Sequence, residues 1–221
     1  MNRILGIALL FALGMYSSHA QKMNSIAFIP EGYVLSETYY GDLNKDGQED
    51  CMLIIKGTNT ANVVINRFDQ EVDRNRRGII VLFKNENTYE LADKNYDCFY
   101  SENEDGGVYY APELDITTER SNLIIHFAHG RYGYWRYIFR FQESAFKLIG
   151  YDASSNHGPR IDRETSINFL TRKKLTRINT NHDAEGGDEV FEETWETIEQ
   201  KQLFNLSEIE KFEDFDMGIT Y

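Results

Sequence analysis

Residues 41–50 read Gly-Asp-Leu-Asn-Lys-Asp-Gly-Gln-Glu-Asp and place an oxygen-bearing side chain at every second position from Asp42. Calcium takes about six to eight oxygen ligands, and a tight loop of alternating Asp and Asn residues can supply them. Glycine at the sixth loop position permits the sharp turn that brings a later carbonyl and carboxylate back toward the ion. The pattern therefore predicts a structural calcium site. Its predicted ligands are the side chains of Asp42, Asn44, Asp46 and Asp50 and the backbone carbonyl of Gln48.

This loop is not a complete EF-hand. Counting from Asp42, the twelfth position is Leu53, where an EF-hand supplies a bidentate Glu. Residues 33–40 are rich in Tyr, Val and Thr, and residues 51–55 are an apolar run of strand length, so we expect flanking strands rather than helices. The alternative interpretation is a polar hairpin turn that binds nothing, because Asn, Asp and Gly are common turn formers.

A calcium loop that closes at its ninth position between strands resembles the loops of FG-GAP repeats in integrin-type propellers. It is also similar to the single GDLNxDGxxD loop of secreted bacterial β-rich proteins. The resemblance to these secreted proteins extends over most of the mature chain and implies a β-rich exported domain, without implying an activity. We find no second copy of the loop, which argues against a propeller. The further matching segments are residues 106–108, 135–140, 148–152 and 166–171.

The first 20 residues have the form of an export signal. A basic start at Arg3 precedes an apolar stretch over residues 4–15, and residues 18–20 have the small-x-small cleavage form. We expect cleavage near Ala20 and export to the periplasm or the extracellular space. The apolar stretch is too short to span a bilayer comfortably, and no later segment could do so. Residues 21–221 are expected to form a single β-rich domain.

The charge of the chain excludes one class of partner. Lys and Arg total 23 and Asp and Glu total 36, for a formal net charge of −13. Such a chain repels nucleic acid phosphates and anionic membrane surfaces. We therefore exclude nucleic-acid binding, whereas cation binding is compatible with the charge.

Two cysteines, Cys51 and Cys98, would meet an oxidising environment after export, where a disulfide can persist. Their apolar or strand-like surroundings also suit two buried thiols. We predict a disulfide between the two cysteines, and the alternative is two buried thiols. Neither cysteine has the neighbouring His spacing or Gly-rich elbow of a nucleophile.

Strand signals separated by short turns cover most of the chain and predict an all-β fold of antiparallel sheets. Residues 190–201 fit either a strand or a helix poorly. Ser207 and Glu210 have capping-box spacing, which predicts one short C-terminal helix. The ranges predicted as strands are 79–83, 89–91, 121–128, 134–142, 145–152, 165–170 and 175–180.

The strand predicted over residues 134–142 has the clearest pattern. Trp135, Tyr137, Phe139 and Phe141 alternate with residues that are mostly polar. Period-two alternation places one face on a core and the other in solvent. The four aromatic rings are therefore predicted to be core residues rather than a sugar-binding platform.

For two other groups of residues we prefer a structural or surface role to a functional one. His126 and His129 would point to opposite faces of a strand, so they should not form a zinc site. The arginine-rich residues 74–77 are expected to form a surface turn that pairs with nearby carboxylates. Those carboxylates belong to Asp69, Glu71 and Asp73.

Two candidate features are compatible with glycan binding or hydrolysis. Acidic residues gather at 102–105 and 183–189, but a glycosidase needs two carboxylates at a defined separation across a cleft. Aromatic residues are 14% of the chain, and rings can stack on sugar faces. The rings that could remain on the surface are those of Tyr109, Tyr110, Tyr132 and Tyr134.

Two functions follow from these patterns. The leading one is a non-catalytic, exported β-rich domain with one structural calcium loop, which binds a partner at the cell envelope. The alternative is a glycan-binding module or a glycoside hydrolase that uses acidic residues. The expected partner is accordingly a protein or a glycan.

Overall fold

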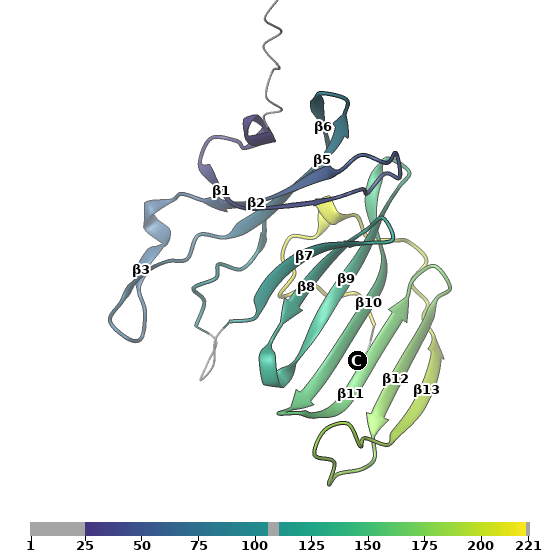
Figure 1. Cartoon of the computed structure of the whole chain (residues 1–221). Helices are drawn as coiled ribbons and strands as arrows, with labels where there is room; N and C mark the ends of the chain where they lie inside the picture. Colours follow the sequence, from purple (N-terminus) through teal and green to yellow (C-terminus); the bar gives the residue numbers. More distant parts are fainter. Residues whose placement is uncertain (1–24, 106–110, 220–221) are drawn as a thin grey trace, which may run out of the picture.

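Two antiparallel sheets form the body of the molecule in the computed structural model, which describes residues 25–105 and 111–219 (Figure 1). A four-stranded sheet has the order β1-β2-β5-β6, and a seven-stranded sheet has the order β13-β12-β11-β10-β9-β8-β7. The regular helical structure in the described part consists of short 3-10 turns. The predicted all-β fold class is therefore confirmed. The predicted signal peptide, residues 106–108, Tyr109 and Tyr110 lie outside the described residues.

The strands follow the sequence closely. The four-stranded sheet contains β1 (Tyr33–Gly41), β2 (Asp50–Gly57), β5 (Arg77–Asn85) and β6 (Thr88–Phe99). The seven-stranded sheet contains β7 (Glu113–Glu119), β8 (Asn122–Ala128), β9 (Gly133–Gln142), β10 (Ala145–His157), β11 (Arg160–Asn168), β12 (Lys173–Asn179) and β13 (Phe191–Thr197). A separate small hairpin contains β3 (Val63–Ile65) and β4 (Glu71–Asp73). The 3-10 turns are η1 (Ser25–Phe28), η2 (Thr60–Asn62), η3 (Gly130–Tyr132) and η4 (Leu206–Glu208).

The structure defines the secondary structure of two regions for which the sequence pattern was weak. The ambiguous segment 190–201 contains strand β13, the edge strand of the larger sheet. The predicted C-terminal helix is instead the single 3-10 turn η4, which follows Asn205. The Asn205 side chain reaches Glu208 with its amide nitrogen, 2.7 Å from Oε1. This turn has no room to lengthen into a helix because its backbone is bound by neighbouring elements, as described below.

The alternation predicted for β9 is confirmed. Tyr137 and Phe139 are buried, and Trp135 and Phe141 are partly buried against the same core. The neighbouring strand β8 contributes buried apolar residues to this face as well, at Leu123, Ile125 and Phe127. Core residues of the smaller sheet join the same cluster, so the two sheets share one hydrophobic core.

Strand β2 is buried on both faces. Met52 and Ile54 belong to the core between the sheets, whereas Leu53 and Ile55 belong to a second cluster on the other side of the smaller sheet. Partly buried side chains from the N-terminal segment and from β1 and β6 pack against this second cluster, including Phe28. Double-sided burial explains why residues 51–55 are continuously apolar rather than alternating.

The two cysteines occupy opposite sides of the smaller sheet, and both are free and buried. Cys51 lies in the outer cluster and Cys98 in the core between the sheets. The predicted disulfide is therefore wrong. A sheet separates the two side chains, and a bridge needs Cβ atoms about 3.5–4.5 Å apart. Burial raises the pKa of both thiols, which keeps them protonated.

A C-terminal segment, residues 199–219, closes the core after β13. It passes behind β7, β8 and β9 in the view of Figure 1 and contributes the buried residue Phe212. The Phe212 ring contacts Phe99 of the smaller sheet at 5.2 Å between centroids and Tyr137 of the larger sheet at 4.9 Å. Its backbone N–H donates to the Cys98 carbonyl at 3.0 Å, and its carbonyl accepts from the Tyr137 hydroxyl at 3.3 Å.

Polar contacts fix the same segment along its length. The Asn95 side-chain amide donates to the carbonyls of Leu206 (2.8 Å) and Ile209 (2.7 Å). Arg76 pairs with the buried carboxylate of Glu213. These bonds satisfy backbone groups that have no strand partner. They also tie the segment to β5 and β6, so it belongs to the core rather than to a tail.

Replacing Phe212 with Ala should destabilise the protein by about 3–5 kcal/mol, because it empties an aromatic site shared by both sheets. Chemical denaturation of the mature protein measures this loss. Phe68→Ala is the control, since Phe68 is 66% exposed and its loss should cost less than about 0.5 kcal/mol. Equal costs for the two variants would show that the C-terminal segment does not hold the sheets together.

The free thiols give a second prediction. Alkylation of the unreduced mature protein should modify two thiols after denaturation and neither while it is folded, because both side chains are buried and protonated. Intact mass spectrometry counts the added groups. Failure to modify either thiol in the denatured, unreduced protein would restore the disulfide.

Candidate functional site

The Asp42–Asp50 loop connects β1 to β2, as predicted from its flanks. Its side-chain oxygens accept hydrogen bonds from its own backbone. Asp42 accepts from the N–H groups of Lys45 (2.7 Å) and Gly47 (3.1 Å), and Asp46 Oδ1 accepts from Gln48 (2.8 Å). Lys45 and Gly47 both have positive φ, of 67° and 84°, which winds the chain tightly around these carboxylates. The loop is therefore shaped by its own acidic side chains.

Asp50 is fully buried and has a different role in the structure. Its Oδ2 accepts from the Leu43 N–H at 2.7 Å, and its Oδ1 accepts from the Lys84 N–H on β5 at 3.0 Å. One carboxylate thus joins the start of the loop to the neighbouring strand. Gln48 adds a longer contact from its side-chain amide to the Lys84 carbonyl, at 3.4 Å.

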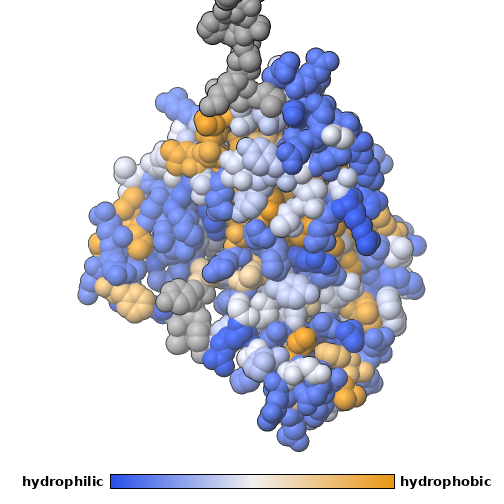
Figure 2. Space-filling model, in the orientation of Figure 1, coloured by the Kyte–Doolittle hydropathy of each residue, from blue (hydrophilic) through white to orange (hydrophobic). Residues whose placement is uncertain are grey.

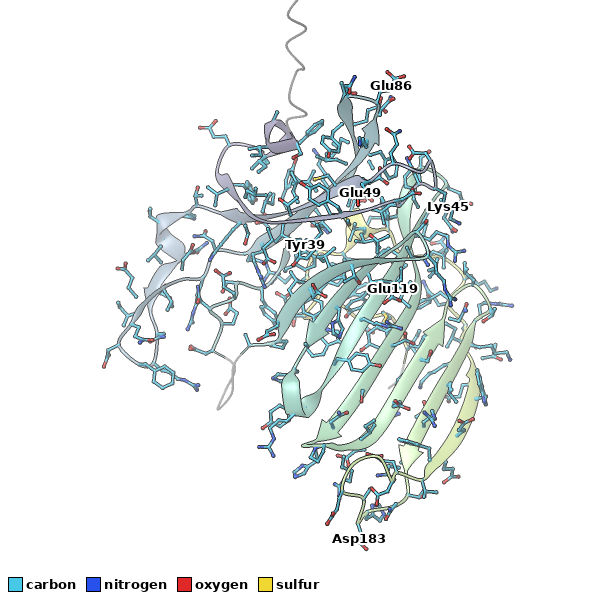
Figure 3. All side chains as sticks on the ribbon, in the orientation of Figure 1. Tyr39, Lys45, Glu49, Glu86, Glu119 and Asp183 are labelled. Atoms are coloured by element: carbon cyan, nitrogen blue, oxygen red, sulfur yellow. The ribbon has the colours of Figure 1, made fainter. Side chains whose placement is uncertain are left out.

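Two apolar contacts fix the base of the loop against the larger sheet. Leu43 is buried in the core between the sheets. Gly41 packs so closely on β7 that an added Cβ would lie 2.3 Å from the Thr118 hydroxyl oxygen. Glycine is therefore required at position 41 by the contact between the sheets. In Figure 3, Lys45 marks this upper region, far from Asp183 at the lower end of the larger sheet.

The donor set of the loop can be compared with the needs of calcium. Each carboxylate oxygen has two lone-pair directions, so an oxygen that accepts one N–H can still bind a cation. The Oδ1 atoms of Asp42, Asn44 and Asp46 each accept one backbone N–H and so meet this requirement. Both oxygens of buried Asp50 face backbone amides instead. In residues 25–105 and 111–219, no three His, Cys, Asp or Glu side chains gather so that they could hold a metal ion.

Local contacts shift the pKa values of two loop carboxyls in opposite directions. The Gln48 backbone N–H, together with the Asn44 side chain, lowers the pKa of exposed Asp46 and keeps it anionic. Burial raises the pKa of Asp50, and the amides of Leu43 and Lys84 offset part of this effect. The exposed carboxylate therefore attracts cations, whereas the buried one carries a desolvation cost.

The arginine-rich residues 74–77 do not form the predicted surface turn. Arg74 pairs with Asp105 at 2.6 Å, Arg76 pairs with Glu213, and Arg77 is buried with its Nε 2.8 Å from the Tyr100 carbonyl. Asp69 and Glu71 are exposed, and Asp73 pairs with Lys56 at 3.2 Å. The prediction was wrong because it assumed partners close in sequence, whereas β5 begins at Arg77 and turns these side chains toward distant segments.

The buried cations Lys56 and Arg77 are cross-strand neighbours on β2 and β5 of the smaller sheet. Glu102 lies between them, 2.5 Å from Lys56 Nζ and 3.8 Å from Arg77 Nε. Burial lowers the pKa of Arg77, and Glu102 opposes that shift. Removing these charges from water costs free energy. The network in turn fixes one arrangement of the segments that contribute its side chains. We interpret it as structural, because every cation in it is paired.

The two histidines contact different tyrosines, and His129 follows the end of β8 at the start of η3 rather than lying on the strand as expected. His126 packs on Tyr134 with 5.4 Å between ring centroids, and His129 packs on Tyr132 at 5.1 Å. Tyr132 and His129 line a hollow beside η3, and Tyr132 and Tyr134 also border a groove over β9, β10 and β11. The sequence singled out these two tyrosines but missed Arg163 and Thr165 on the far side of that groove. Only the strand register brings those residues into the groove.

Apolar side chains are scattered over the visible face rather than gathered in one large patch (Figure 2). No helix in the described residues is long and apolar enough to cross a membrane.

Comparisons with protein-family models, with curated proteins and with solved structures found no match.

Asp50→Asn should destabilise the protein by about 1–3 kcal/mol in the presence of a chelator, because one buried amide donor loses its acceptor. Urea unfolding measures the difference, with Glu49→Gln as a control that removes an exposed charge from the same loop. The Glu49 variant should match wild type within about 0.5 kcal/mol.

The pH dependence of that difference follows from the raised pKa of Asp50. The folded state binds the Asp50 proton more tightly than the unfolded state, so the advantage of wild type over Asp50→Asn is largest at low pH. It should shrink as the pH rises from about 4 through the raised pKa, and then stay constant. An advantage that grows over this range would mean that the amide hydrogen bonds outweigh burial.

Proposed function

We propose that the chain is an exported, non-catalytic β-sandwich domain whose Asp42–Asp50 loop binds calcium, and that the domain binds a partner at the cell envelope. The observation that carries the calcium proposal is the internal hydrogen bonding of the loop. Asp42, Asn44 and Asp46 are already held on one tight turn, each with an oxygen bound to a backbone N–H. Preorganised oxygens reduce the ordering cost of binding an ion.

The proposed ion would act mainly on stability. With Leu53 in the place of a bidentate Glu, the loop should have the weak affinity of extracellular calcium modules, at about 10⁻⁴–10⁻³ M. An ion that binds the folded loop and not the unfolded chain stabilises by mass action, by about 2.7 kcal/mol at a hundredfold excess over Kd. Gly41 and Leu43 connect this loop to the shared core, so the stabilisation would reach both sheets.

The alternative of a glycoside hydrolase has weaker support. A cavity of about 430 Å³ beside β12 and β13 is lined by Glu196 and Glu199, but Glu196 pairs with Lys174 at 2.9 Å. A paired carboxylate is a poor general acid, because the cation holds it ionised. The groove bordered by Tyr132, Tyr134 and Trp135 is lined by no Asp or Glu among the described residues. These observations favour a binding domain over a hydrolase.

Thermal unfolding with calcium and with chelator tests the calcium proposal. Wild type should melt several degrees higher in millimolar calcium, and Asp46→Ala should lose this increment while melting near wild type in chelator, because Asp46 is exposed. Glu49→Gln removes the same charge from the same loop and should keep the increment. Equal melting temperatures of wild type in both buffers, with no heat of binding at millimolar calcium, would leave the loop as a turn only.

A further inference from the structure

A groove over β9, β10 and β11 results from the register of these three strands. Trp135 of β9, Ala153 of β10 and Thr165 of β11 lie in one cross-strand row. Gly133, Ser155 and Arg163 occupy the next row on the same face, so the small side chains of Ala153 and Ser155 on β10 lie beside Trp135, Thr165 and Arg163. A paired row of side chains shares one face of the sheet. The hollow thus has a floor of small residues and walls formed by Trp135 on one side and Arg163 and Thr165 on the other.

The groove has the size and lining of a small-ligand site. Its volume is about 380 Å³, near the lower end of the range for ligand pockets, which begins at about 300 Å³. The Trp135 ring stacks on Phe127 with 5.3 Å between centroids and 15° between planes, so its orientation is fixed by the core. Trp135 is only partly buried and also lines the groove, so the prediction of a core residue instead of a sugar-binding platform holds only in part for this ring. The lining residues combine aromatic rings with hydroxyl groups and one cation: Tyr132, Tyr134, Trp135, Tyr151, Ala153, Ser154, Ser155, Arg163 and Thr165.

Arg163 is the distinctive member of this lining. Its Nε is buried and has no hydrogen-bond partner in the described part of the chain, and Arg163 makes no ion pair there. The nearby arginines are paired, Arg160 with Asp162 at 2.8 Å and Arg177 with Glu164. An unpaired guanidinium is unexpected in a chain that carries 36 acidic and 23 basic residues. A buried donor without an acceptor is costly, so a bound acceptor at this position would be stabilised.

The acidic loop next to β11 does not supply that acceptor. Glu189 accepts from the backbone N–H groups of Ile161 (2.9 Å) and Gly187 (2.8 Å). Asp188 accepts from the backbone of Glu185 at 2.9 Å. These carboxylates fold the loop on itself and leave Arg163 facing the groove.

We propose that this groove binds an acidic saccharide, with its carboxylate on Arg163 and a sugar ring against Trp135. The planar guanidinium matches a carboxylate with two parallel hydrogen bonds. Aromatic faces suit the apolar face of a sugar ring, and Ser155 and Thr165 can bond its hydroxyl groups. The inference rests on the proposed binding role, whose ligand class it names, and is independent of calcium because the loop and the groove lie on different elements.

Calorimetry of the mature protein in chelator tests the ligand. The probes are trisaccharides of galacturonate, glucuronate and mannuronate, with maltotriose as the neutral ring compound and citrate as the carboxylate without a ring. At least one uronate should bind at least about tenfold more tightly than maltotriose and citrate, since a hydrogen bond to a charged group adds to ring contact. No uronate binding up to about 1 mM, or equal binding of maltotriose, would overturn the proposal.

Two groove variants and one matched control locate the binding. Arg163→Gln should weaken uronate binding at least about tenfold, whereas Arg172→Gln, which removes the same charge from an exposed turn at the other end of β11, should leave it unchanged. Ser155→Trp fills the floor from an exposed position and should abolish binding without loss of stability. Unchanged uronate affinity in Arg163→Gln or Ser155→Trp would exclude the groove. A calcium-dependent melting temperature with no uronate binding would leave the calcium proposal standing.

Discussion

The structure depends on one segment that packs between two sheets whose described strands form separate hydrogen-bonded ladders. Phe212 touches rings from both sheets, and its backbone is bound on one side to Cys98 and on the other to Tyr137. Antiparallel strands satisfy their neighbours within a sheet, but they provide no bonds between sheets. The inter-sheet contact is therefore carried mainly by side-chain packing, beside single bonds such as the one from the Phe146 N–H to Asp93 at 3.3 Å. The C-terminal segment, which pairs with a strand only through the bridge between Asn205 and Lys147 among the described residues, supplies the Phe212 ring to this packing.

The β1–β2 loop lies at another place where the sheets meet. Gly41 contacts Thr118, Leu43 enters the core, and Asp50 bonds to the backbone of β5. The loop thus combines a solvated surface rich in oxygen atoms with a base that is part of the packing. A buried carboxylate with two amide partners is compatible with this position because its charge is met by dipoles that are already in place.

The sequence predicted what depends on local periodicity. Alternation in residues 134–142 identified the core face of β9, and the polar run at Asp42–Asp50 identified the connection between two strands. Sequence patterns did not predict contacts between residues that lie far apart in the sequence. Arg76 pairs with Glu213, 137 positions later, and the two cysteines lie on opposite sides of one sheet. The groove was missed for the same reason, since a shift of one residue in the register of β10 or β11 would turn Arg163 to the opposite face.

The position of Phe212 also sets an order on folding. A ribosome makes the chain from its N-terminus, so every described strand is complete before this ring becomes available. Until then the inner faces of the sheets lack their central contact, and the rings of Phe99, Phe127 and Tyr137 share a partly open core. Contacts between residues this distant in sequence form slowly, because the intervening loop must first be closed. The nascent chain accordingly remains loosely packed until its final part emerges, a state in which it can still be threaded or bound by a chaperone.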